Sequence, residues 1–206
     1  MSYRKLQAAS GAVEGPGTQQ PACINNQPRS LYLDDAVRTP GDMKPTNPSA
    51  FASGRRSLDR SVWYNGWLLT FLATGEETQG QFALIEAVGR RGNVPPPHIH
   101  RKEDEITYVL EGEVVFSVAD RTIKGTPGTM IFLPRDERHS FTIESEQVRM
   151  LILVTPAGLE GWFKEFSVPA PAMTLPPADE PTYGEVQRML ESALGYGLEF
   201  DLPETR

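Results

Sequence analysis

The stretch GNVPPPHIHRKEDEITYVLEGE, residues 92–113, decides how this chain folds and where its chemistry lies. It holds two of the chain's three histidines, His98 and His100, one residue apart. Alternate residues of a β-strand point to the same face, so both imidazoles are predicted to project from one side of a strand, where they could share a metal ion. The three prolines before them cannot donate ladder hydrogen bonds, which predicts a sheet edge or a barrel mouth.

A glutamate opens the apolar run that follows the histidines. Burial of Glu105 there is costly unless the carboxylate is paired or ligated, and coordination of the same ion would remove that cost. Its neighbours Glu103 and Asp104 fall in the charged turn and are expected to be solvated, so neither is chosen as a ligand. Glu105 is also the candidate catalytic residue, because a carboxylate that loosens from a metal can accept a substrate proton as a general base.

The third histidine, His139, lies 39 positions after His100, at the start of another strand-like run. A meander could return this run to the first one, which would bring all three imidazoles together with Glu105. The predicted metal ligands are therefore His98, His100, Glu105 and His139. No cysteine is among them, which argues against a structural zinc site of the cysteine-rich kind. The set suits one divalent transition metal, Fe, Mn, Ni, Co, Cu or Zn, without selecting among them.

Composition excludes several classes of protein. The chain has 206 residues, which suits one domain with tails, and its net charge is −7 with no cluster of lysine and arginine. That balance argues against nucleic acid and against an anionic membrane as partners. The first residues lack the apolar region of a secretory signal, and Cys23 is the only cysteine. A cytoplasmic protein with a small-molecule substrate is therefore expected.

The chain divides into three parts by composition and hydrophobic pattern. Residues 1–56 are rich in Gly, Pro, Ser, Gln and Asn without periodicity and are predicted to be a partly disordered arm. Residues 57–168 are predicted to form a barrel, and 169–206 a proline-rich connector with a C-terminal helix. Within the barrel, short runs rich in β-branched and aromatic residues follow one another at 66–73, 81–88, 105–110, 113–119, 129–134, 139–143 and 148–155. Closely spaced strands without intervening helices predict an all-β, antiparallel sandwich or barrel.

Two helices are predicted after the strands. Leu159, Trp162, Phe163 and Phe166 have helical spacing and share one apolar face. Thr182 and Glu185 then form a capping-box pattern, an apolar stripe follows, and Gly195 is a plausible stop. The apolar faces are expected to pack on the outside of the barrel or on a second subunit.

These residues resemble the cupin superfamily. The first cupin motif, G-x5-H-x-H-x4-E-x6-G, is matched at each fixed position, and the second, G-x5-P-x-G-x2-H-x3-N, is matched in GTMIFLPRDERHSFTI (128–143) apart from two positions. The matching residues are Gly92, His98, His100, Glu105 and Gly112, then Gly128, Pro134 and His139. Asp136 stands where the family usually has glycine, and Ile143 where it has asparagine. Asp136 is expected to tolerate a left-handed turn, so the departures bear on loop geometry.

More narrowly, the chain is similar to quercetin 2,3-dioxygenase-like cupins of a single domain. The features that carry this are TGEETQGQFALIEA (74–87), TPAGLEGWFKEF (155–166) and YGLEF (196–200). The resemblance implies a double-stranded β-helix, or jelly-roll barrel, in a homodimer. It also implies a dioxygenase that binds O2 and an aromatic or enolisable hydroxy-ketone at a 3-His/1-Glu metal. Two alternatives remain open: a non-oxidative isomerase, cyclase or lyase that uses the metal as Lewis acid, and a non-catalytic binding cupin.

Four residues are candidates for shaping the substrate pocket. Thr107 and Val109 share a strand face with Glu105, whereas Tyr108 points the opposite way. Met130 and Phe132, from the run that begins the second motif, are the other two candidates. For all four, ordinary core packing is the alternative.

Overall fold

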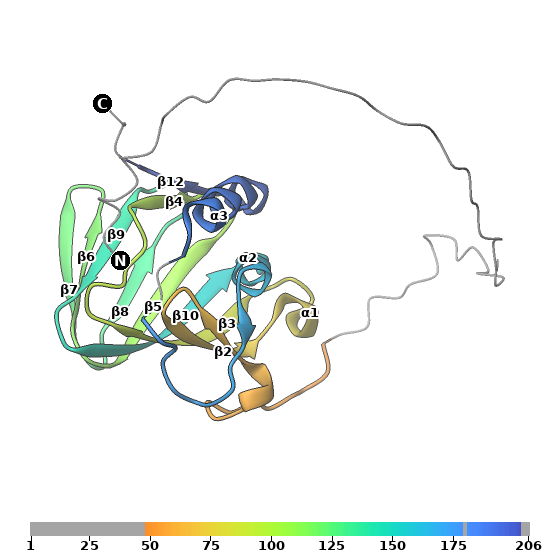
Figure 1. Cartoon of the computed structure of the whole chain (residues 1–206). Helices are drawn as coiled ribbons and strands as arrows, with labels where there is room; N and C mark the ends of the chain where they lie inside the picture. The colour runs from red at the N-terminus through yellow and green to blue at the C-terminus, as the bar shows by residue number, and fades with distance from the viewer. Residues whose placement is uncertain (1–47, 179–180, 203–206) are drawn as a thin grey trace, which may run out of the picture. The chain divides into compact units, whose positions relative to one another are not determined.

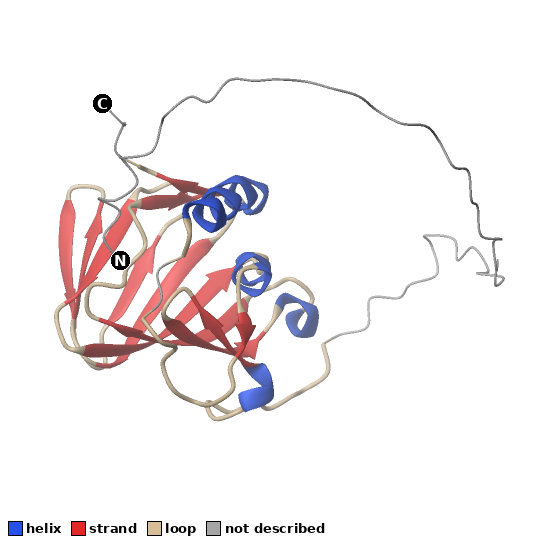
Figure 2. Ribbon diagram, in the orientation of Figure 1, coloured by secondary structure: helices blue, strands red, loops and turns tan. Residues whose placement is uncertain are grey.

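The computed structural model describes residues 48–178 and 181–202. The strands in this part of the chain form two antiparallel β-sheets, and the helices are few (Figures 1 and 2). The predicted all-β jelly-roll barrel is therefore confirmed. Most of the arm predicted over residues 1–56 lies outside the described residues. No helix in the described part of the chain is long and apolar enough to span a membrane.

Seven strands form the larger sheet, in the order β11-β1-β2-β3-β10-β5-β8. Its strands are β1 (Ser61–Tyr64), β2 (Trp67–Ala73), β3 (Ala83–Arg90), β5 (Asp104–Glu111), β8 (Met130–Leu133), β10 (Gln147–Thr155) and β11 (Val168–Pro169). The five-stranded sheet has the order β12-β4-β9-β6-β7. It consists of β4 (His98–His100), β6 (Val114–Val118), β7 (Arg121–Gly125), β9 (His139–Ile143) and β12 (Leu198–Phe200). Each of the seven predicted runs overlaps a strand, while β1, β7, β11 and β12 have no predicted counterpart.

The histidine strand β4 does not lie at the edge of its sheet. On one side it pairs with β9, and on the other it pairs with the C-terminal strand β12, with Leu198 opposite His100. The prolines before β4 nevertheless reach an opening, because Pro95 and Pro96 line the main cavity. Of the two placements predicted from these prolines, the barrel mouth is correct and the sheet edge is wrong, because a strand almost 100 residues further on covers that edge.

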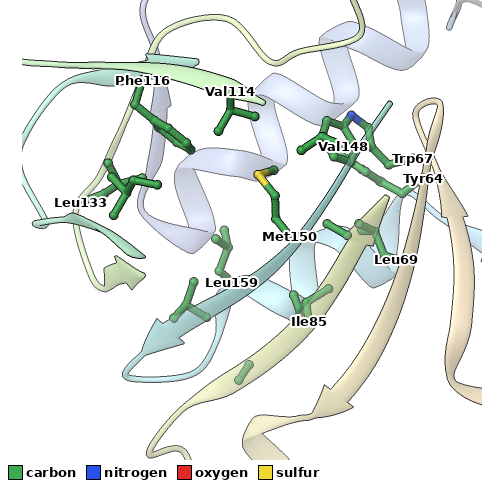
Figure 3. Packing of buried hydrophobic residues seen from close by; sticks show 14 of the residues in the cluster. Tyr64, Trp67, Leu69, Ile85, Val114, Phe116, Leu133, Val148, Met150 and Leu159 are labelled. Atoms are coloured by element: carbon green, nitrogen blue, oxygen red, sulfur yellow. The ribbon is translucent and has the colours of Figure 1, made fainter. Parts of the chain in front are cut away.

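The core lies between the two sheets. Phe116 of β6 and Ile85, Leu133 and Met150 of the larger sheet are almost completely buried there, as Figure 3 shows. Strand β8 alternates strictly, so its residues Ile131 and Leu133 point inward. Inward-facing apolar side chains from both sheets thus form one continuous core.

Two of the predicted pocket residues lie on the outside of the barrel. Met130 is 57% exposed and Phe132 50% exposed, and both stand on the outer face of β8 beside the exposed Tyr108 of β5. Their proposed place in the pocket is therefore corrected. The run MIFL is apolar at every position, so its sequence carries no period-2 signal to say which pair faces inward.

The described part of the chain also contains three α-helices. They are α1 (Gly75–Thr78), α2 (Leu159–Glu165) and α3 (Tyr183–Tyr196), with a 3-10 turn at Leu58–Arg60. The capping box predicted at Thr182 is present, and α3 ends at Tyr196 with Gly197 in the left-handed conformation, two residues beyond the predicted stop. The Trp162 indole N–H donates to the Met189 carbonyl at 3.1 Å and thus joins α2 to α3.

A short ion pair fastens α1 to the start of the barrel. The Arg60 guanidinium makes two parallel hydrogen bonds to the Glu77 carboxylate, at 2.8 and 2.7 Å. Mainly through these bonds, the pKa of Glu77 falls from its ordinary value of 4.5 to about 2. A carboxyl whose pKa is lower in the folded state contributes stability above its unfolded pKa and loses it as the pH falls through the folded value.

Glu77→Gln should therefore lower the thermal unfolding midpoint at pH 7 by about 2–4 °C, which corresponds to about 1 kcal/mol in a domain of this size. The deficit should shrink as the pH falls from about 4.5 towards about 2, where the wild-type carboxyl also becomes neutral. Thermal melts over this pH range provide the measurement. Glu76→Gln, in the same helix but outside the ion pair, should change the midpoint less. A deficit for Glu77→Gln that stays constant with pH would contradict this account.

Candidate metal centre

The three histidines of the chain meet at one point inside the barrel. His98 and His100 project from β4, and His139 begins the neighbouring strand β9, directly opposite His98 in the register. Each ring can offer one nitrogen such that these three atoms all lie within 4.8 Å of one another. The residues are 7%, 3% and 2% exposed, in chain order. The pairing of β4 with β9 thus brings the imidazoles together, as predicted.

Hydrogen bonds hold each ring by its Nδ1 atom. His98 Nδ1 lies 2.8 Å from the Pro96 carbonyl oxygen, and His139 Nδ1 lies 3.0 Å from the Glu137 carbonyl oxygen. A carbonyl oxygen can only accept, so both Nδ1 atoms carry the proton. A neutral ring in this tautomer leaves Nε2 with a free lone pair.

The Nε2 atoms fit a metal ion. Those of His100 and His139 are buried without any hydrogen-bond partner among the residues that the structure describes. Burying a polar atom without a hydrogen-bond partner destabilises the fold. One cation bound by the Nε2 atoms of both strands would give each of them a partner. The donor set of imidazole nitrogens suits a divalent transition metal.

Electrostatics favour the neutral, ligating form of two of the rings. Burial lowers the pKa of His98 well below 6.5, and the charges of the other two imidazoles act in the same direction. Burial likewise lowers the pKa of His139. His100 differs: burial opposes its protonation, but its hydrogen bond to the Glu103 carboxylate and the nearby charge of Glu105 outweigh burial and raise its pKa.

Glu105 stands beside the three rings. Its Oε2 atom lies 3.6 Å from His100 Nε2, and its Oε1 accepts a hydrogen bond from the Thr107 hydroxyl at 3.0 Å. The group of ligand atoms within 4.8 Å of one another comprises the histidines alone, so the carboxylate is adjacent to that group rather than inside it. This position suits a carboxylate that ligates or that accepts a proton, and the fourth-ligand role stays a prediction.

Glu103 differs from the prediction. It was expected to be solvated, but it is only 2% exposed, and its Oε1 lies 2.9 Å from His100 Nδ1. The chain turns between β4 and β5, which brings a residue three positions after His100 back against its ring. Asp104 does lie near the surface, in a two-point ion pair with Arg135. The i, i+3 spacing of His100 and Glu103 was the only sequence signal for this contact.

A cavity of about 970 Å³, open solvent included, adjoins the histidines. Aromatic and aliphatic side chains make up most of its wall. They come from the β1–β2 hairpin, α2, α3 and β12 as well as from the sheets, and include Tyr64, Trp67, Trp162, Phe163, Val186, Met189, Leu190, Leu198 and Phe200. Besides the site residues, Asn65 and Asn93 are its polar lining, and no lysine or arginine lines it in the described ranges.

None of the four residues predicted to shape the pocket lines this cavity. Thr107 and Val109 are buried on the inner face as expected, but they belong to the barrel interior and do not line the cavity. The helices contribute instead, through Trp162 of α2 and Val186 of α3. Their apolar stripes were predicted to pack on the outside of the barrel or on a second subunit. Residues of both stripes instead belong to the core and line the cavity, and packing on a second subunit stays a prediction.

The second motif keeps its geometry despite its departures. Asp136 has a φ of 66°, the left-handed conformation that glycine usually supplies, and its amide donates to the His100 carbonyl at 2.8 Å. This bond links the turn before His139 to the strand of the other two histidines. Ile143 is a buried residue at the end of β9, opposite Val114.

Comparison with known proteins shows what this chain is similar to. Residues 85–155 match the family described as "Cupin domain". The chain is also 26% identical over 98 residues to quercetin 2,3-dioxygenase of Bacillus subtilis (strain 168). That alignment covers 48% of this chain and 29% of the relative, so the chain spans less than a third of the length of this curated relative.

Three solved structures similar to this chain follow. KdgF from Halomonas sp. is 17% identical, with a TM-score of 0.47 over 55% of this chain and 98% of that one. An RmlC-like cupin from Shewanella frigidimarina NCIMB 400 is 18% identical, with a TM-score of 0.47 over 56% and 99%. Ectoine synthase from P. lautus is 25% identical, with a TM-score of 0.44 over 60% and 90%.

Proposed function

This chain carries a cupin domain and has quercetinase-like relatives, and from that premise we propose that it is a metal-dependent dioxygenase of an aromatic or enolisable hydroxy-ketone. One observation carries the proposal. Three buried imidazoles turn their free nitrogens towards a common point in an apolar cavity, with a carboxylate beside them. A cavity used for binding alone has no need of such a set.

His98, His100 and His139 would hold the metal, with Glu105 as fourth ligand. A divalent metal there would supply a Lewis acid for a substrate hydroxyl and a centre for reaction with O2. Glu105 is placed to take the hydroxyl proton, because its carboxylate lines the cavity and the Thr107 hydroxyl holds its other oxygen. Loss of that proton leaves an electron-rich enolate, the form of the substrate that O2 attacks.

The cavity wall supports a neutral, flat substrate. Its aromatic side chains suit stacking or edge contacts with rings. No cationic side chain lines it in the described part of the chain, so a substrate carboxylate or phosphate that lies away from the metal would have no counter-charge. The amides of Asn65 and Asn93 are the groups available to orient substrate hydroxyls or carbonyls.

Oxygen uptake tests the proposal. Protein loaded with Fe, Mn, Ni, Co or Cu in turn should consume O2 when a flavonol is added, in a ratio of about one O2 per flavonol, because a dioxygenase places both oxygen atoms in its product. The matched control substrate is the flavone that lacks only the enolic hydroxyl, and it should give no uptake. An oxygen electrode together with the loss of flavonol absorbance provides the measurement.

Other outcomes separate the alternatives. Conversion of an enolisable substrate without O2, also with Zn loaded, would replace the dioxygenase by an isomerase, cyclase or lyase. Substrate binding without turnover with any of the metals would instead indicate a binding cupin. Either result would overturn the proposed dioxygenase while leaving the three-histidine site in place.

A further inference from the structure

We propose that Glu103 is the positioning residue of the metal centre: its buried carboxylate orients His100 and makes that ring the strongest nitrogen donor of the three. The inference rests on the three-histidine metal site of the proposed function, but not on the oxygenase activity.

The three rings have different partners at Nδ1. His98 and His139 donate to backbone carbonyls, which are present whatever side chain stands at that position. His100 alone donates to a side chain, the Glu103 carboxylate, at 2.9 Å. An ionised carboxylate is a stronger acceptor than a carbonyl, so it draws the Nδ1 proton and raises electron density at Nε2.

The burial of Glu103 indicates that its carboxylate interacts with His100 rather than with solvent. The side chains of Glu103 and His100 are 3% and 4% exposed. In the described ranges, the His100 contact is the one hydrogen bond of the Glu103 carboxylate. Removing a carboxylate from water for one hydrogen bond is costly, and a metal on the far nitrogen of His100 would add positive charge on the other side of that ring.

Glu103 acts through His100 rather than on the substrate. It does not line the cavity, whereas His100 and Glu105 do. The His100 ring therefore lies between two carboxylates: Glu103 on Nδ1, away from the cavity, and Glu105 at 3.6 Å from Nε2, inside it. Glu103 is expected to set ring orientation and donor strength, while Glu105 faces the reacting groups.

Cobalt(II) binding tests this division of roles. The variants are Glu103→Ala, which removes the acceptor, and Glu103→Gln, which keeps an acceptor of similar shape without the charge. Affinity for Co(II), measured by competition with a chromophoric chelator, should fall about 10–100-fold in Glu103→Ala and less in Glu103→Gln. The visible absorption of bound Co(II) should shift in both, because the donor strength of one ligand has changed. Glu113→Gln, which removes an exposed carboxylate paired with Lys124, should change neither quantity.

The outcomes are distinguishable. If wild-type protein does not bind Co(II), the metal site itself is wrong. If wild type binds and both variants match it in affinity and spectrum, Glu103 does not position the ligand and the inference is overturned. Thermal melts of the metal-free proteins identify a folding defect. If Glu103→Ala is unfolded, the isosteric Glu103→Gln decides, and an unchanged affinity and spectrum in that variant would equally overturn the inference.

Discussion

Replacement of His100 by alanine should strip the protein of its metal. Wild-type protein purified without chelator is expected to carry about one equivalent of a transition metal, and His100→Ala less than about a tenth of that. The truncation removes one of three converging nitrogens and leaves the buried Glu103 carboxylate without its partner. Elemental analysis by mass spectrometry of the two proteins, prepared side by side, provides the measurement.

A substitution on the outer face of β5, the next strand along the chain, serves as the control. Tyr108→Ala removes a larger side chain from β5, but that ring is exposed on the outside of the barrel, so metal content should stay at the wild-type level. Circular dichroism would show that both variants keep their strands. Equal metal in wild type and folded His100→Ala would show that the ligand assignment is wrong.

The second large effect is expected from Glu105→Gln. If the carboxylate accepts the substrate proton, the neutral amide cannot, and kcat per bound metal should fall by about 100–10,000-fold. KM should change much less, because the amide has nearly the same shape and can keep the hydrogen bond from the Thr107 hydroxyl. Steady-state rates of O2 uptake, divided by the metal content of each preparation, provide the measurement.

Glu111→Gln is the matched control for this variant. It makes the same chemical change in the same strand, but its side chain is largely exposed at the far end of β5 and pairs with Arg149. Its kcat should equal that of wild type. Glu105→Gln protein that retains full kcat per metal would remove Glu105 from the proton transfer. A kcat that falls only in proportion to lost metal would make Glu105 a ligand alone.

Strands and histidines illustrate what local sequence can predict. β-Branched and aromatic runs bounded by Gly and Pro signal strands without any tertiary information, and each predicted run overlaps a strand of the structure. The H-x-H spacing works for the same reason, since the pleat puts His98 and His100 on one face whatever else the chain does. The αL tolerance expected of Asp136 is also a local property, and the residue has that conformation.

The incorrect predictions concern the direction or burial of a side chain, which depends on the residues that surround it in the folded chain. Met130 and Phe132 were expected inside, but MIFL is apolar throughout, and only the pairing of β8 with β5 selects the inward pair. Glu103 was expected in solvent, because no local rule shows that the turn folds its carboxylate under the His100 ring. The apolar stripe of α3 was recognised, but its direction depends on how β12 docks beside β4.

Strand content and an antiparallel all-β class can be predicted from this sequence, because both follow from backbone periodicity and turn residues over short distances. The jelly-roll class was implied instead by the resemblance to the two cupin motifs, whose fixed positions also include the three histidines. Folding of the whole chain sets which carboxylate contacts His100, which helices line the cavity and which faces stay exposed. Those features depend on contacts between segments up to about 100 residues apart, such as the pairing of Leu198 with His100, whose energies are set by packing and burial rather than by local preference.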